Sequence, residues 1–170
     1  TVEEVVRLGA DAIAVAMFVY CKEEMRYIRH LSEVVREAAA FGLPVIPHIY
    51  PLASGDERHA VLHDAEHIFY AARVGMEMGA DIIKVPYTGD VASFCDIVNT
   101  FNVPVVAAGG PRCATLTDAE NMVRDIGKTG AAGATVGRNV WGFEDIPLAI
   151  KTLKIAINEG LEAHKGPTGL

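Results

Sequence analysis

The chain has 170 residues, a formal net charge of −7 and a hydrophobic fraction of 51%. This length suits a single domain with a buried core, and an acidic chain without a cluster of Lys and Arg lacks the footprint of a nucleic-acid-binding protein. The longest uncharged apolar run, residues 12–21, is too short to span a bilayer, and three widely spaced cysteines without a CxxC pair predict neither a disulfide framework nor a zinc ribbon. We therefore expect a soluble, cytoplasmic protein that buries apolar surface against another chain or a missing segment.

Helical and strand patterns alternate from the first residue. Residues 1–9 are expected to form a short helix with Thr1 and Glu4 as a capping box, and residues 10–18 an apolar strand. Apolar spacing predicts a helix over residues 22–41, followed by a strand over 44–50. The buried face of this helix is expected to carry Met25, Ile28, Leu31, Val35 and Ala38.

A third helix is predicted over about residues 59–78, and its expected inner face carries Leu62, Ala65, Ile68, Phe69, Ala72 and Met76. The next strand is centred on Lys84. Asp90 then caps a helix to about residue 101, which Asn102 closes in the left-handed conformation that glycine usually takes.

The remaining elements repeat the same order. A strand over residues 103–108 precedes a helix that ends at Lys128, with Thr117 and Glu120 as its expected capping box. A strand over 131–136, a helix over 145–158 and a tail over 161–170 complete the chain.

Five β/α repeats with fully apolar strands predict an α/β fold built on a parallel sheet. Such a sheet is either open and doubly wound or part of a barrel, and a closed (β/α)8 barrel needs eight units and about 250 residues. If the chain is the carboxyl-terminal part of a barrel, the Lys84 strand is the sixth.

Lys84 is the first candidate for chemistry. It interrupts the apolar run of Ile82, Ile83 and Val85, where loss of hydration favours a neutral, nucleophilic amine. The alternative is a lysine that extends its ammonium group to water or pairs with a carboxylate.

Two later strands end in glycine-bearing turns, Gly109-Gly110 and Gly137-Arg138. Backbone N–H groups of glycines and the guanidinium of Arg138 can bind a phosphate, and barrels place their phosphate site after the last two strands. Taken alone, each turn is a weak signal, since glycine after a strand more often forms only a tight turn.

Tyr50 ends the strand that precedes the Lys84 strand, and His48 lies on the same face two residues earlier. A phenol there can exchange a proton with a substrate hydroxyl, although a rim tyrosine and a packed histidine are also compatible with the spacing.

Residues 63–67 match the inverted zinc-protease pattern H-x-x-E-H. His63 and His67 lie opposite the apolar stripe of their predicted helix, so we expect them to face solvent and predict no metal site.

Taken together, residues 79–90, 108–111 and 136–140 resemble motifs of the lysine Schiff-base aldolases of the DeoC/FbaB type. The resemblance is strongest to the archaeal-type class I fructose-bisphosphate aldolases. It implies a (β/α)8 TIM barrel of which residues 1–160 are strands four to eight. In family members, the Tyr-Pro that ends the strand before the lysine strand is usually followed by Arg-Gly, whereas Tyr50-Pro51 is followed here by Leu52.

The resemblance implies that Lys84 forms the imine, that Tyr50 donates and accepts the proton, and that Gly109, Gly110, Gly137 and Arg138 hold phosphate. It implies no cofactor, a phosphorylated ketose or aldehyde as substrate, and a homo-oligomer. The expected reaction cleaves fructose 1,6-bisphosphate to dihydroxyacetone phosphate and glyceraldehyde 3-phosphate. Alternatives are a 2-amino-3,7-dideoxy-heptulosonate synthase, a thiolase for a phosphorylated ketone, or a non-catalytic half-barrel that serves as an assembly component.

Overall fold

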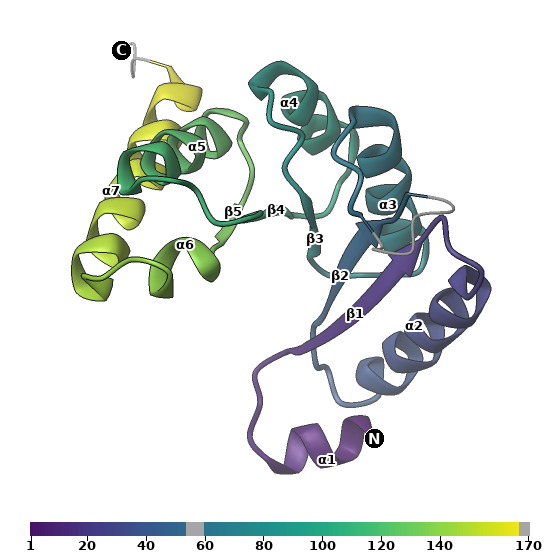
Figure 1. Cartoon of the computed structure of the whole chain (residues 1–170). Coiled ribbons are helices and arrows are strands. Elements are labelled where there is room, and N and C mark those ends of the chain that lie inside the picture. Colours follow the sequence, from purple (N-terminus) through teal and green to yellow (C-terminus); the bar gives the residue numbers. More distant parts are fainter. Residues whose placement is uncertain (54–59, 167–170) are drawn as a thin grey trace. The chain divides into compact units, whose positions relative to one another are not determined.

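The structure is a computed structural model of the chain, and it describes residues 1–53 and 60–166. The chain divides into two compact units, residues 1–85 and residues 86–170. Within the described residues, five strands alternate with helices, which confirms the α/β fold expected from the sequence (Figure 1).

The first unit contains three helices and three parallel strands. In chain order these are α1 (Val2–Arg7), β1 (Ile13–Val19), α2 (Glu24–Ala39), β2 (Val45–Pro51), α3 (Ala65–Glu77) and β3 (Ile83–Pro86), of which Pro86 falls in the second unit. β1 pairs with β2 over seven residues, and β2 pairs with β3 with His48 opposite Lys84.

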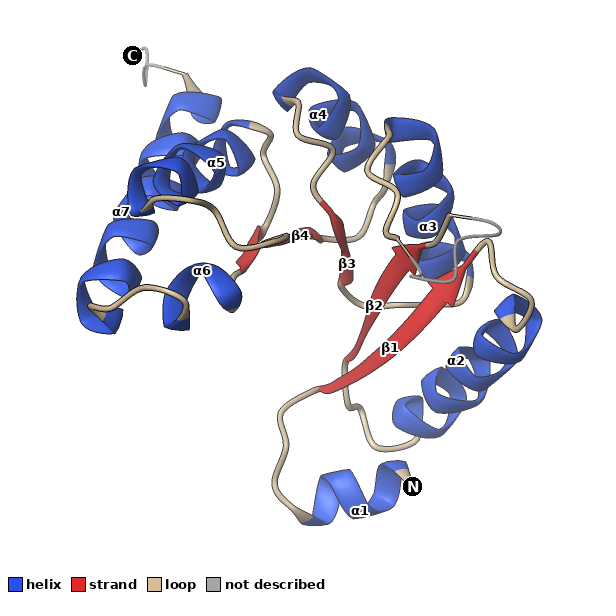
Figure 2. Ribbon diagram, in the orientation of Figure 1, coloured by secondary structure: helices blue, strands red, loops and turns tan. Residues whose placement is uncertain are grey.

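The second unit also has parallel strands followed by helices (Figure 2). Its elements are α4 (Val91–Thr100), β4 (Val105–Ala108), α5 (Leu116–Lys128), β5 (Gly133–Thr135), α6 (Arg138–Trp141) and α7 (Ile146–Lys165). β4 pairs with β5, so that Ala108 lies opposite Thr135, and α5 packs against both β5 and α7.

The core of the first unit lies between its strands and the helices α2 and α3. Met17, Ile49 and Ile83, one from each strand, are fully buried, and α2 and α3 contact the strands. Gly75 brings α3 close to the sheet, because a Cβ there would lie 2.9 Å from Cδ1 of Ile49. Since side chains alternate along a strand, the intervening residues point to the other face, which is less buried.

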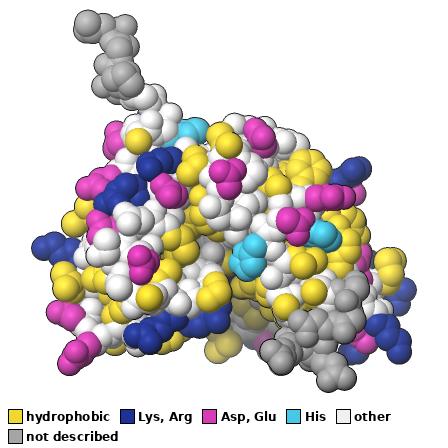
Figure 3. All heavy atoms as spheres, turned by 45° about the horizontal axis from the view of Figure 1, so that its top comes forward, with side chains coloured by type: hydrophobic (Ala, Val, Ile, Leu, Met, Phe, Trp, Pro, Cys, Tyr) yellow, Lys and Arg dark blue, Asp and Glu magenta, His cyan; other side chains and the backbone are white. Residues whose placement is uncertain are grey.

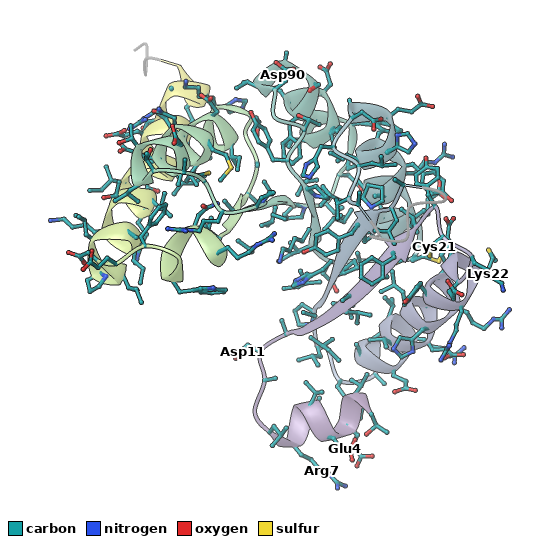
Figure 4. All side chains as sticks on the ribbon, in the orientation of Figure 1. Glu4, Arg7, Asp11, Cys21, Lys22 and Asp90 are labelled. Carbon is teal, nitrogen blue, oxygen red and sulfur yellow. The ribbon has the colours of Figure 1, made fainter. Side chains whose placement is uncertain are left out.

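Two of the expected helix caps are confirmed. Thr1 and Glu4 form the capping box of α1, and the carboxylate of Asp90 accepts a hydrogen bond from the Ser93 N–H at the start of α4 (Figure 4). The capping box of α5 was placed wrongly, since Thr115 and Asp118 form it, two residues earlier than expected. The backbone N–H of Asp118 donates a hydrogen bond to the Thr115 hydroxyl oxygen, which fixes the first turn of α5.

Asn102 does not take the left-handed conformation. Among the described residues, Tyr20 is the single non-glycine residue with positive φ, and α4 instead ends in extended backbone at Phe101. The backbone therefore passes from α4 into the loop before β4 without a residue in the left-handed conformation.

The predicted limits and buried faces of two helices also need correction. α3 begins at Ala65 because Asp64 caps it, so Leu62 precedes the helix, and the expected start at residue 59 lies outside the described residues. Met25 and Phe69 are 67% and 36% exposed, and Val34 and Ala71 are buried on those helices instead.

α7 continues to Lys165 rather than stopping at Asn158. Gly160 does not end the helix, because it lies against α5, and the His164 ring Nδ1 lies 2.9 Å from the Lys128 carbonyl oxygen, at hydrogen-bonding distance. These contacts with α5 hold residues 161–165, which the sequence predicted to be part of a tail.

Side chains of different kinds alternate over the surface. On the face that Figure 3 shows, acidic, basic and apolar side chains are interspersed. None of the helices in residues 1–53 and 60–166 has the length and apolar character that crossing a membrane requires.

Candidate active site

Lys84 lies in the middle of β3 with a half-buried side chain, between the buried Ile83 and Val85. Burial lowers the pKa of the Lys84 amine below its ordinary value of 10.5. A larger share of the amine is therefore neutral and nucleophilic at a given pH than in an exposed lysine.

Lys84 has a polar partner, His48, on the adjacent strand. Its Nδ1 lies 3.5 Å from Lys84 Nζ, and the two residues are opposite one another in the β2–β3 pairing. The pKa of His48 is lowered from 6.5, first by burial and then by the charge of Lys84. Both effects favour the neutral imidazole.

Tyr50 lies on the same face of β2 as His48, because the two residues are two positions apart. Its ring lies 6.1 Å from that of Phe18, its partner in the β1–β2 pairing. β1 contributes the exposed Ala16 opposite His48. This face, here called the site face, thus presents an amine, an imidazole and a phenol above small or apolar neighbours.

The carboxyl end of β1 contains a feature that the sequence did not reveal. Tyr20 takes a φ of 61°, which is uncommon outside glycine. Its N–H donates to one carboxylate oxygen of Glu24 at 2.5 Å, and the Tyr70 hydroxyl donates to the other at 2.5 Å. The carboxylate fixes this strand end, which leads through Cys21 and Lys22 into α2 (Figure 4). No sequence signal pointed to it.

In the second unit, both residues of the Gly109-Gly110 turn need to be glycine. The Gly109 N–H donates to the Thr135 carbonyl at 2.9 Å, and a Cβ on Gly109 would lie 2.9 Å from Cα of Val136. Gly110 has a φ of 62°, which disfavours any residue with a side chain. The turn therefore keeps β4 in close contact with β5.

Asn139 is a further residue of this region whose role the sequence did not indicate. Its side chain is fully buried and donates to the carbonyl oxygens of Gly109 and Pro111 at 2.9 and 2.8 Å. Its Oδ1 accepts a hydrogen bond of 2.6 Å from the Cys113 N–H. Asn139 therefore fixes the turn after β4 to the turn after β5. Its place directly after Gly137-Arg138 was visible in the sequence, but its partners, some 26 to 30 residues earlier, were not.

The predicted site residues divide between the units. Lys84 and Tyr50 share the site face of the first unit, whereas all four predicted phosphate ligands belong to the second. Gly137 packs against the ring of Trp141, and Arg138 is the first residue of α6.

The H-x-x-E-H pattern does not form a metal site in the described part of the chain. His63 precedes α3 and is exposed, so it is not one helical turn from His67 on a shared face. His67 Nδ1 instead lies 2.5 Å from the carboxylate of Asp64. Residues 1–53 and 60–166 contain no group of three His, Cys, Asp or Glu side chains that could hold a metal ion.

Curated relatives of the chain include aldolases. It is 36% identical over 148 residues to the class 1 fructose-bisphosphate aldolase of Thermoproteus tenax. This match covers 85% of this chain and 54% of the relative. It is also 36% identical over 143 residues to the 2-amino-3,7-dideoxy-D-threo-hept-6-ulosonate synthase of Halobacterium salinarum. This match covers 83% of this chain and 51% of the relative. The chain thus spans about half the length of these two relatives.

Solved structures of aldolases are also similar to this chain. An archaeal fructose-1,6-bisphosphate aldolase whose catalytic lysine is covalently bound to the carbinolamine intermediate matches with a TM-score of 0.84 and 32% identity. The match covers 92% of this chain and 62% of that chain, and the expected fold is confirmed, since this chain covers part of a TIM barrel of the archaeal aldolase kind. The family model of the DeoC/LacD family aldolases matches residues 1–142, and the chain therefore belongs to this family of aldolases.

Proposed function

We propose that Lys84 is the imine-forming lysine of a class I aldolase that cleaves fructose 1,6-bisphosphate. The observation that carries the proposal is the half-buried amine of Lys84, with its lowered pKa, on one face with His48 and Tyr50. The solved archaeal aldolase whose catalytic lysine is covalently bound to the carbinolamine intermediate supports the same chemistry.

In the proposed reaction, the neutral amine of Lys84 adds to the ketone carbon of the sugar, and loss of water gives a protonated imine. The imine is an electron sink, because it accepts the electron pair of the breaking carbon–carbon bond as an enamine. No metal ion is needed for this step, since the positive charge of the iminium stabilises the developing carbanion.

Tyr50 is proposed to remove the proton of the hydroxyl group two carbons from the imine carbon. The C–O bond of that carbon then becomes a carbonyl as the carbon–carbon bond breaks, and glyceraldehyde 3-phosphate leaves. Protonation of the enamine and hydrolysis of the imine release dihydroxyacetone phosphate and restore Lys84.

The glycine-bearing turns of the second unit are proposed to bind a phosphate group. Gly110 and Gly137 would offer backbone N–H groups and Arg138 a guanidinium, whereas the N–H of Gly109 already donates to the Thr135 carbonyl and so holds the turn in place. The hydrogen bonds that Asn139 makes to the Gly109 turn support this assignment, because they hold that turn in one conformation.

The test of this proposal uses the full-length protein that the gene encodes. It is incubated with dihydroxyacetone phosphate, reduced with borohydride and digested, and the modified peptide is mapped by mass spectrometry. We expect a reduced adduct on Lys84 that is lost in Lys84→Met and kept in Lys22→Met, since Lys22 is exposed. An unmodified Lys84 would overturn the proposal and favour a non-catalytic assembly component.

The heptulosonate synthase of Halobacterium salinarum supports a second candidate substrate. It shares 36% identity with this chain, as does the fructose-bisphosphate aldolase of Thermoproteus tenax. Cleavage of fructose 1,6-bisphosphate in a coupled assay separates the two. If the protein forms the Lys84 adduct but does not release glyceraldehyde 3-phosphate from fructose 1,6-bisphosphate, a transaldolase-like synthase or a thiolase is the better assignment.

A further inference from the structure

We infer that His48 is a further catalytic residue, whose Nδ1 accepts the proton that Lys84 Nζ loses while the imine forms. The inference rests on the proposed function of Lys84 and goes beyond it, because it gives a proton acceptor to the step that precedes bond cleavage.

The position of His48 follows from the sheet and not from a mobile loop. His48 and Lys84 are direct partners in the parallel pairing of β2 and β3, so both side chains leave the strands on the site face. Their nitrogen atoms are 3.5 Å apart, at the outer limit of a hydrogen bond. A small movement of the flexible lysine side chain brings the two atoms to the distance that proton transfer needs.

The surroundings of the two nitrogens disfavour the charged form of each group. Burial lowers the pKa of both groups, and the charge of Lys84 lowers that of His48 further. From β1, the neighbours that face His48 are Ala16 and Phe18, neither of which titrates. Tyr50 is the other titratable side chain that the described strands of this unit place on the site face. A neutral imidazole beside the amine is therefore a base within reach of the reacting nitrogen.

Imine formation at Lys84 moves one proton to His48 and back. The lone pair of Nζ forms the N–C bond, the π pair of the carbonyl moves to oxygen, and the oxygen takes a proton from solvent. An N–H bond of the resulting ammonium then breaks, and its proton binds Nδ1 of His48. When the hydroxyl group leaves, the imidazolium returns this proton to it, so that water departs and His48 is again neutral.

The test measures the rate of imine formation in a single turnover. The full-length protein is mixed with dihydroxyacetone phosphate, and the reaction is quenched with borohydride at set times. His48→Asn keeps an oxygen that can accept a hydrogen bond from Lys84 but cannot take up a proton. We expect it to slow adduct formation on the order of a hundredfold, whereas His30→Asn, at an exposed position on α2, leaves the rate unchanged.

A second variant separates proton transfer from positioning. In His48→Ala, added imidazole is expected to restore part of the lost rate in proportion to its concentration, which a purely structural role would not allow. If His48→Asn reacts at the wild-type rate, or if imidazole leaves His48→Ala unchanged, the role of His48 is wrong while that of Lys84 stands. If the wild-type protein forms no adduct on Lys84, both assignments fall.

Discussion

Gly127 of α5 and Gly160 of α7 lie against each other where the two helices meet. A Cβ built on either residue would come within 2.8 Å of the Cα of the other. A Cβ on Gly127 would also meet the backbone of Ile157 and Leu161, which cannot move aside as a flexible side chain can. The close packing of the second unit therefore depends on two glycines inside helices, where glycine alone would weaken the helix.

Replacement of either glycine by alanine should therefore destabilise the second unit. We expect Gly127→Ala and Gly160→Ala each to lower the free energy of unfolding by roughly 1–3 kcal/mol, because overpacking outweighs the gain in helix propensity of at most about 1 kcal/mol. Urea denaturation followed by circular dichroism measures this. Asn158→Ala, at an exposed position on α7, is the control and should not destabilise. Alanine variants as stable as the wild type would show that the helices can move apart without cost.

Tyr50→Phe should separate imine formation from bond cleavage. Without the phenolic hydroxyl, the substrate hydroxyl keeps its proton, so we expect turnover of fructose 1,6-bisphosphate to fall about 10²–10⁴-fold. Borohydride trapping on Lys84 should persist, because this step does not need the proposed base. Tyr27→Phe is the matched control, since Tyr27 packs on Phe18 from α2. Full turnover in Tyr50→Phe would remove Tyr50 from the mechanism.

Asn139→Ala should weaken both stability and phosphate binding. It leaves the carbonyl groups of Gly109 and Pro111 and the N–H of Cys113 without their side-chain partner, at a cost of roughly 1–3 kcal/mol in the free energy of unfolding. Asn139→Asp should not rescue it, because a carboxylate cannot donate to the two carbonyls. Inhibition by inorganic phosphate reports on binding, and Asn99→Ala, at an exposed position, is the control. An unchanged inhibition constant would separate Asn139 from the phosphate site.

Local signals in the sequence predicted much of this structure correctly. Alternating apolar strands and helices indicated the β/α repeats, and the short-range capping pair Thr1 and Glu4 was placed correctly because both partners lie within one turn. The lowered pKa of Lys84 followed from its apolar neighbours alone. These features depend on residues close together in the chain.

Features that depend on distant partners could not be predicted in this way. Phe69 and Met25 fit an apolar helical period, but the strands beneath those helices decided which face is buried. The last helix was expected to stop at Asn158, yet contact of Gly160 with Gly127, far away in the sequence, accompanies its continuation to Lys165. The hydrogen bonds of Asn139 likewise reach residues of the preceding β/α unit.

The coupling of Lys84 and His48 predicts a pH dependence that does not require catalysis. Burial first and the Lys84 charge second lower the pKa of His48 from 6.5, so below pH 6.5 the unfolded chain binds more protons at this site and stability falls as the pH falls through the folded value. Lys84→Met removes the charge but not the burial, and should raise the pKa of His48 while leaving it below 6.5. An NMR titration of the His48 Cε1–H signal, assigned with His48→Asn, measures the shift, and Lys22→Met is the control. A midpoint that stays unchanged in Lys84→Met would show that the two groups are not coupled.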